Sequence, residues 1–363
     1  MGTEREELPL AGVRVLEIGG GQAAAFATCW LAGFGADVVR SDAPRETLGR
    51  DEQAALLAGK RRIGVGDAQL RELALAADLV FEDGVPGALA ERGLDPRALL
   101  REKPALVVVS LTPFGQTGPA ARWRASNLVA HAAGGILSLT GLATRAPLQN
   151  GGNQAWMLLG LNGSSAALVA YFGSLVHGEG DWLDVSAQDC AAGMLEYYGP
   201  RAAFDNTPTV RLGNRVNCLW GIFPVADGFA GVCALQRQAP AFLAMTDDPA
   251  LADPRFLEPG HRLTNDAEIG NLVARWFADK KKRDLLAMGE THKVPMGAVM
   301  TPLDLLGNAS LDERGFFDAV STPAGEARVP GRPYLGMPWR AGELHAPASD
   351  NDAVLRDWLT ERG

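Results

Sequence analysis

Val13-Arg14-Val15-Leu16-Glu17-Ile18-Gly19-Gly20-Gly21 is the stretch that decides the class of fold. Apolar and β-branched residues dominate its first six positions, which predicts a buried strand, and the three glycines end that strand. Residues 23–33 then predict a helix and residues 36–41 a second strand. A strand that leads through a glycine turn into a helix and another strand is the repeating unit of a parallel sheet.

The same alternation continues along the next part of the chain. Residues 79–82 and 106–110 predict two further strands, and helical patterns at 68–76 and 86–92 lie between the strands. Alternation of this kind is typical of an α/β fold, in which helices cover both faces of a parallel sheet.

Four regions follow from the change in pattern along the chain. Residues 1–206 predict the N-terminal part of a large domain, with apolar helices at 127–139 and 158–177. The polar segment 207–218 predicts a linker, and 219–320 a smaller α+β domain that begins with strands. Residues 321–363 predict a return to the large domain, through an extended Pro- and Gly-rich tail and a last amphipathic helix.

Composition argues against several classes of function. The net charge is −9 and no basic stripe is interleaved with aromatic residues, so nucleic acid is not an expected partner. The four cysteines form no Cys-x-x-Cys pair, and neither a metal site nor a disulfide framework is expected. The uncharged stretch 155–176 is long enough to span a membrane, but Asn162 and several serines interrupt it, which favours a core helix. The charged segment 1–7 does not resemble a signal peptide, and we expect a cytoplasmic protein.

The glycine turn also matches a nucleotide-binding pattern. Residues 19–24 fit G-x-G-x-x-A between a strand and a helix, and Asp42 follows about twenty residues later. Glycines let the backbone approach a phosphate, and the helix N-terminus attracts the negative charge. An NAD-dependent dehydrogenase is therefore an alternative, although none of the five histidines stands in a recognisable catalytic context.

A longer series of motifs follows one order along the chain. It opens with Leu10 to Glu17 and Leu31 to Val39, and its most specific piece is 110–119, Ser-Leu-Thr-Pro-Phe-Gly-Gln-Thr-Gly-Pro. Other pieces stand at 60–61, 77–87, 184–186, 213–215, 227–228, 253–256 and 294–299. In this order the motifs resemble those of the family III CoA-transferases, the CaiB/BaiF family.

The resemblance implies a fold, an assembly and a ligand. It implies a Rossmann-like large domain with a parallel sheet, a smaller α+β domain, and two chains interlocked as a dimer. CoA or an acyl-CoA is the implied ligand, with no other cofactor. The implied contacts that this chain keeps are Gly21, Gln22, Ala23, Arg40, Lys60 and Arg61. Other family positions have changed: an arginine is replaced by Ala43, another by Glu91, and Asn-Phe by Asp83-Gly84.

The catalytic carboxylate of the family is missing. The resemblance implies an Asp that attacks the donor thioester, at the position of Leu159 or Gly160. No Asp or Glu stands anywhere between Lys103 and Gly178, where about nine would be expected at the average frequency of the chain. The His-Asp pair of the related racemases is also absent, because Ser126-Asn127 stands in its place.

Two functions remain from this pattern. The first is the non-catalytic subunit of a heteromeric CoA-transferase of the arylsuccinate type, paired with a homologue that keeps the Asp. The alternative is a standalone enzyme that uses the fold for lyase, isomerase or cyclase chemistry on an acyl thioester. In that case the polar groups of the substrate pocket would be Asn127, His131, Gln154 and Asn162.

Overall fold

The computed structural model describes residues 8–42, 47–206, 210–322 and 325–359. Two compact units make up the chain. The first contains residues 1–137, 149–206 and 309–363, and the second contains 138–148 and 207–308. Ala43 and the charged segment 1–7 lie outside the described residues.

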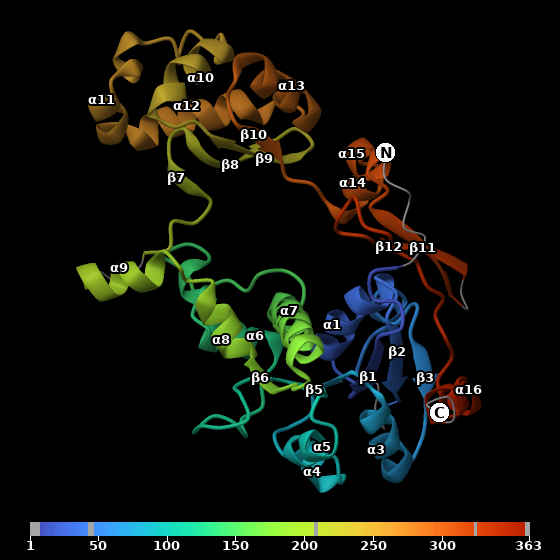
Figure 1. Ribbon diagram of the computed structural model, residues 1–363. Helices are drawn as coiled ribbons and strands as arrows, with labels where there is room; N and C mark the ends of the chain where they lie inside the picture. The colour runs from blue at the N-terminus through green and yellow to red at the C-terminus, as the bar shows by residue number, and fades with distance from the viewer. Residues whose placement is uncertain (1–7, 43–46, 207–209, 323–324, 360–363) are drawn as a thin grey trace. The chain divides into compact units, whose positions relative to one another are not determined.

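A six-stranded parallel sheet forms the centre of the first unit (Figure 1). Its strand order is β3-β2-β1-β4-β5-β6, the order of a doubly wound nucleotide-binding sheet. The strands are β1 (Arg14–Ile18), β2 (Asp37–Ser41), β3 (Arg61–Ile63), β4 (Leu79–Glu82), β5 (Val107–Thr112) and β6 (Trp182–Ser186). Because β4 lies beside β1, the order reverses between these two strands and opens a crevice beyond their carboxyl ends.

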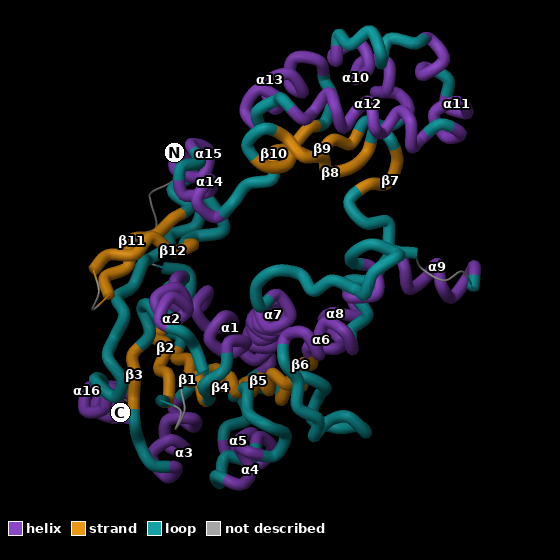
Figure 2. The backbone as a smooth tube through the Cα atoms, turned by 180° about the vertical axis from the view of Figure 1, so that it is seen from behind, coloured by secondary structure: helices purple, strands orange, loops and turns teal. Residues whose placement is uncertain are grey.

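Helices cover both faces of this sheet, as the alternation of strands and helices predicts (Figure 2). On one face α1 (Gln22–Gly33) and α7 (Gln154–His177) pack over Val15, Val38 and Phe81. On the other face α3 (Asp67–Ala76), α5 (Pro96–Glu102) and α16 (Asn351–Leu359) pack over the alternate strand residues, among them Leu16 and Val80. Side chains that alternate along each strand therefore build two separate cores.

Helices α1 and α7 approach each other closely because α7 presents a glycine to α1. A Cβ on Gly160 would lie 2.5 Å from the carbonyl oxygen of Ala23 and 3.1 Å from the backbone nitrogen of Ala27. No side chain larger than hydrogen fits there without moving a helix.

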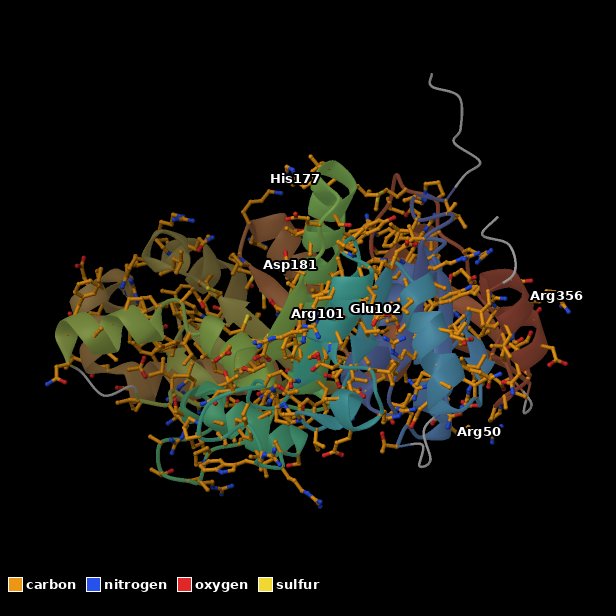
Figure 3. All side chains as sticks on the ribbon, turned by 60° about the horizontal axis from the view of Figure 1, so that its bottom comes forward. Arg50, Arg101, Glu102, His177, Asp181 and Arg356 are labelled. Carbon is orange, nitrogen blue, oxygen red and sulfur yellow. The ribbon has the colours of Figure 1, made fainter. Side chains whose placement is uncertain are left out.

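Figure 3 labels His177 at the C-terminal end of α7 and Asp181 just before β6.

Helix α7 departs in part from the predicted core helix. Its inner residues, such as Leu159 and Ala167, are buried. Its outer face is not: Val169, Phe172, Leu175 and Val176 are between 59% and 74% exposed. By length and composition α7 could also cross a membrane, but core helices of globular proteins pass the same test.

The remaining described elements of the first unit are short. They are α2 (Arg50–Leu56), α4 (Ala88–Glu91), α6 (Asn127–Ala133), a 3-10 turn (Ile136–Leu139) that runs into the second unit, α8 (Ala187–Gly193), α9 (Tyr198–Asp205), α15 (Ala309–Glu313), and the antiparallel hairpin β11 (Phe317–Thr322) with β12 (Gly325–Pro330). The hairpin corrects the extended tail predicted after residue 322. Val320 and Val329 from the hairpin pack on Ala54 of α2, so the chain has rejoined the first unit before residue 321.

The second unit is an antiparallel sheet of order β10-β9-β8-β7 with a layer of helices. Its strands are β7 (Arg215–Asn217), β8 (Trp220–Val225), β9 (Gly228–Cys233) and β10 (Met296–Ala298), and its helices are α10 (Ala239–Thr246), α11 (Pro259–Thr264), α12 (Asp266–Ala278), α13 (Lys282–His292) and α14 (Pro302–Leu306), with 3-10 turns at Gln236–Gln238 and Pro254–Leu257. The predicted linker 207–218 contains β7 and belongs to this unit. Leu212 of this segment forms a β-bridge with Leu142 of segment 138–148, which also belongs to the second unit.

Candidate functional site at the edge of the parallel sheet

A pocket opens in the first unit beyond the carboxyl ends of β1, β4 and β5. Its volume is about 430 Å³. The glycine turn after β1 lies on one side of it, Asp83 follows β4, and α7 forms a further wall. The lining residues are Gly21, Gln22, Ala23, Thr47, Leu48, Glu52, Asp83, Leu111, Pro113, Ala125, Asn153, Trp156 and Leu159. This is the crevice in which doubly wound proteins bind their ligands.

Asp83 binds the N-terminus of α1 with its carboxylate. Oδ1 accepts a hydrogen bond of 3.3 Å from the N–H of Gly21, and Oδ2 accepts one of 3.2 Å from the N–H of Ala24. These are amides that the helix leaves without a partner of its own, and they favour a negative charge. A carboxylate of the chain thus occupies the position in which the glycine pattern predicts a ligand phosphate.

The glycines of the turn make room for this carboxylate. A Cβ on Gly19 would lie 2.2 Å from Oδ1 of Asp83, and a Cβ on Gly21 would lie 2.2 Å from Oδ2. Gly19 also has a φ of +138°, which L side chains rarely adopt. The close approach of the Asp83 side chain therefore explains the glycines at positions 19 and 21.

Burial raises the pKa of Asp83 to about 6. The negative charge of Glu17 acts in the same direction, whereas the hydrogen bonds from Ala24 and Gly21 and the positive charge of Arg40 oppose the rise. The carboxyl group is therefore ionised at neutral pH but takes up a proton under mildly acidic conditions.

A second carboxylate, Glu52 of α2, lies in the same pocket. It accepts hydrogen bonds from Nε2 of Gln22 at 3.1 Å and from Nδ2 of Asn153 at 3.2 Å. The N–H of Gly49 donates to its other oxygen at 2.8 Å. These donors hold Glu52 against the wall beside the glycine turn, so the polar end of the pocket carries two carboxylates and two amides.

The opposite wall of the pocket is apolar and comes from β5 and α7. Leu111, Trp156 and Leu159 line it. Of the two positions implied for the missing carboxylate, Gly160 packs against the backbone of α1 and cannot carry a side chain. Leu159, the other position, lines the pocket.

Arg40 and Lys60, two of the implied CoA contacts, lie in the core. Both are fully buried and form ion pairs with the buried Glu17. Nζ of Lys60 lies 2.8 Å from Oε2 of Glu17 and also donates to Oγ1 of Thr28 at 2.7 Å. Burial alone would raise the pKa of Glu17, but Lys60 and Arg40 lower it to about 2. We therefore assign both cations to the charge balance of the core rather than to a ligand site.

Arg61 and Asp42 are also bound within the chain. Arg61 lies on β3, where Nε donates to Asp37 at 3.0 Å and Nη1 donates to Asp357 of α16 at 2.8 Å. Oδ1 of Asp42 accepts from Nε of Arg62 at 2.9 Å. The sequence pattern does not predict β3, because this short edge strand is charged. Through Arg61, β3 binds the C-terminal helix α16.

None of the four predicted substrate-pocket residues lines the pocket. Asn127 joins two helices, since Nδ2 donates to the carbonyl of Gly152 at 3.2 Å and Oδ1 accepts from Ala155 N–H at 2.9 Å. His131 is buried on α6, and burial lowers its pKa. Gln154 and Asn162 are exposed. Among the implied CoA contacts, Gly21, Gln22 and Ala23 do line the pocket.

Asp83, Glu52, Asn153 and Trp156 are among the pocket residues that the sequence analysis did not predict. Asp83 could have been found, because it follows β4 directly and the carboxyl ends of parallel strands meet at one edge. Glu52, Asn153 and Trp156 carry no such signal. Their place depends on how α2 and α7 pack against the glycine turn.

The fold and the pocket together define a Rossmann-like α/β protein with a ligand crevice at the point where the strand order reverses. The family model for CoA-transferase family III matches residues 10–352. The chain belongs to CoA-transferase family III.

Relatives and solved structures agree with this assignment. The probable CoA-transferase Rv1866 of Mycobacterium tuberculosis is 30% identical over 356 residues, covering 91% of this chain; the chain spans only 45% of that relative. Subunit BbsE of the succinyl-CoA:(R)-benzylsuccinate CoA-transferase of Thauera aromatica is 27% identical, covering 86% of this chain and 84% of the subunit. A CaiB/BaiF family protein from Brucella suis has a TM-score of 0.88 and 25% identity, with coverage of 97% and 100%.

Proposed function

We propose that this chain is the non-catalytic subunit of a heteromeric, cytoplasmic CoA-transferase, in which a homologous chain supplies the nucleophilic Asp. The partner chain would transfer CoA between an acyl-CoA and a carboxylic acid. The observation that carries the proposal is the α7 wall of the pocket, where Leu159 stands at the position implied for the nucleophile.

Two further features support the proposal. Among the relatives, BbsE is by its name a subunit of a CoA-transferase. In addition, the outer face of α7 exposes Val169, Phe172, Leu175 and Val176 in one stripe. Contiguous apolar surface of this kind marks a protein–protein interface. We infer that another chain covers it, in the interlocked dimer that the resemblance implies.

Co-expression with an Asp-bearing homologue tests the proposal. Size-exclusion chromatography should show a stable complex, and an acyl-transfer assay should detect turnover only in the complex. Replacing the nucleophilic Asp of the partner by Asn should abolish turnover, whereas Leu159→Met in this chain should leave it within about twofold, because the swap conserves volume in an apolar wall. Turnover of an acyl-CoA by this chain alone would contradict the proposal.

The standalone enzyme remains a second candidate because of one observation. The pocket holds two carboxylates, Asp83 and Glu52, opposite an apolar wall, and a carboxyl group with a pKa of about 6 can exchange protons near neutral pH. In that case the isolated chain should convert an acyl thioester, and Asp83→Asn should remove the conversion.

A further inference from the structure

We propose that Asp83 sets the ligand selectivity of this pocket: its carboxylate acts as an internal ligand of the glycine turn and excludes a phosphate or carboxylate group from the N-terminus of α1. The inference rests on the proposed function and deepens it, since it names the feature that keeps this chain from binding an anionic group where the active subunit would. Its test needs only the isolated chain.

The first argument is occupancy. The two hydrogen bonds from Gly21 and Ala24 to separate oxygens of Asp83 are the contacts that a bound anion would make with the start of a helix. The glycines are fitted to the carboxylate so closely that a single added carbon would lie 2.2 Å from it. A second anion cannot enter until Asp83 leaves.

The second argument is charge. Behind the glycine turn, Glu17 forms ion pairs with both Arg40 and Lys60. Both Arg40 and Glu17 lie close enough to change the pKa of Asp83. Asp83 therefore places a negative charge at the N-terminus of α1 and near Arg40, and its removal would make this end of the pocket less negative.

The third argument is position. The glycine turn follows β1 and Asp83 follows β4, the two neighbours between which the strand order reverses. This is the crevice in which doubly wound folds bind nucleotides and other ligands. With Asp83 in place, the pocket offers an incoming group the amides of Gln22 and Asn153 and the apolar wall of Leu111, Trp156 and Leu159. It therefore selects an uncharged group.

Calorimetric titration with pyrophosphate tests the inference directly. Asp83→Ala removes the carboxylate and its volume, and we expect pyrophosphate to bind this variant at least about tenfold more tightly than the unmodified chain, as a charge-assisted hydrogen bond is worth. Asp83→Asn removes only the charge and keeps the volume, so a smaller gain is expected. Glu52→Gln is the matched control, because Glu52 is a carboxylate of the same pocket that does not bond to the turn.

Two results would overturn the inference. One is equally tight binding by the unmodified chain and Asp83→Ala. The other is an equal gain in Glu52→Gln and Asp83→Ala, which would show a general charge effect. Circular dichroism checks that each variant folds, and the conservative Asp83→Asn provides a second reading should Asp83→Ala unfold.

A pH series in the unmodified chain gives an independent measurement with sulfate, whose charge is constant over the range used. The groups that face Asp83 are Glu17, Arg40, Glu82 and the amides of the turn. As pH falls from about 8 to about 5, Asp83 takes up a proton and sulfate should bind more tightly. Asp83→Ala keeps Glu82, whose pKa is about 7, and should show a smaller dependence than the unmodified chain; if the dependence is the same in both, the inference is wrong. An active heteromer with no gain in Asp83→Ala would reject the inference and leave the proposed function standing.

Discussion

Gly21 and Asp83 stand in direct steric and polar contact: the N–H of Gly21 donates to Oδ1 of Asp83 at 3.3 Å, and a Cβ on Gly21 would lie 2.2 Å from Oδ2. The backbone at Gly21 is extended, with φ −90° and ψ 168°, which any residue can adopt. The requirement for glycine at this position therefore comes from Asp83, whose carboxylate holds the three atoms nearest to such a Cβ.

Gly21→Ala should destabilise the first unit by about 1–3 kcal/mol, because the added methyl group overlaps the carboxylate. Combined with Asp83→Ala, the loss should largely disappear, and a double-mutant cycle from urea denaturation gives the coupling. Gly66→Ala is the matched control: Gly66 also precedes a helix in extended backbone and has open space around it. Additive losses in the double mutant would show that the contact is not the cause.

Lys60→Met should lower the free energy of unfolding by about 3–5 kcal/mol, because it leaves Glu17 buried with only one of its two cations. Arg71→Met is the control, since Arg71 forms an exposed pair with Glu102, labelled in Figure 3 at the end of α5. Its loss should cost less than about 1 kcal/mol. Equal effects in urea denaturation would contradict a structural role for Lys60.

Glu82 should make stability depend on pH near neutrality. Burial raises its pKa to about 7, hydrogen bonds from Ser110 and Gly84 oppose the rise, and the charges of Asp83 and Asp184 add to it. Because the pKa is higher in the folded state, the contribution of Glu82 is fully present below its unfolded pKa and is lost as pH rises through about 7. Denaturation at several pH values should show a fall in stability over that window, and Glu82→Gln should reduce it to the part that Asp83 contributes. An unchanged slope in Glu82→Gln would assign the dependence to other groups.

The purified chain should form no acyl-enzyme adduct within residues 103–178, since that stretch contains no Asp or Glu. Incubation with an acyl-CoA, trapping with hydroxylamine and mass spectrometry of peptides would detect one. An Asp-bearing homologue treated in the same way is the positive control. An adduct on any residue of this stretch would show that another nucleophile replaces the carboxylate.

Trp358→Ala should destabilise the first unit by about 3–5 kcal/mol. Trp358 of α16 is buried in the core between the sheet and helices α3, α5 and α16, and its Nε1 donates to Asp37 of β2 at 2.7 Å. Trp123→Ala is the control: Trp123 is 65% exposed, and its loss should change stability by less than about 1 kcal/mol. Similar midpoints for the two variants in thermal unfolding would contradict a docking role for α16.

The sequence alone determined the parallel sheet, the glycine turn after the first strand and the absence of an acid on the long apolar helix. These features are local: strand and helix periodicity, turn residues and residue counts depend on neighbours along the chain. The order of the motifs also carried the family assignment, which the match over residues 10–352 confirms. The observed ends of the helices and strands differ from the predicted ends by a few residues. The sequence pattern did not predict strand β3, which is short and charged.

Only the tertiary structure decided which polar groups face a ligand. Lys60 and Arg61 are adjacent, yet Lys60, just before β3, points into the core towards Glu17, while Arg61, the first residue of β3, reaches Asp37 and Asp357. Asp83 meets Gly21 across 62 positions of sequence because β1 and β4 are neighbours in the sheet. A glycine turn has the same sequence whether a phosphate or a carboxylate of the chain fills it, and the packing of strands that are distant in sequence makes that choice.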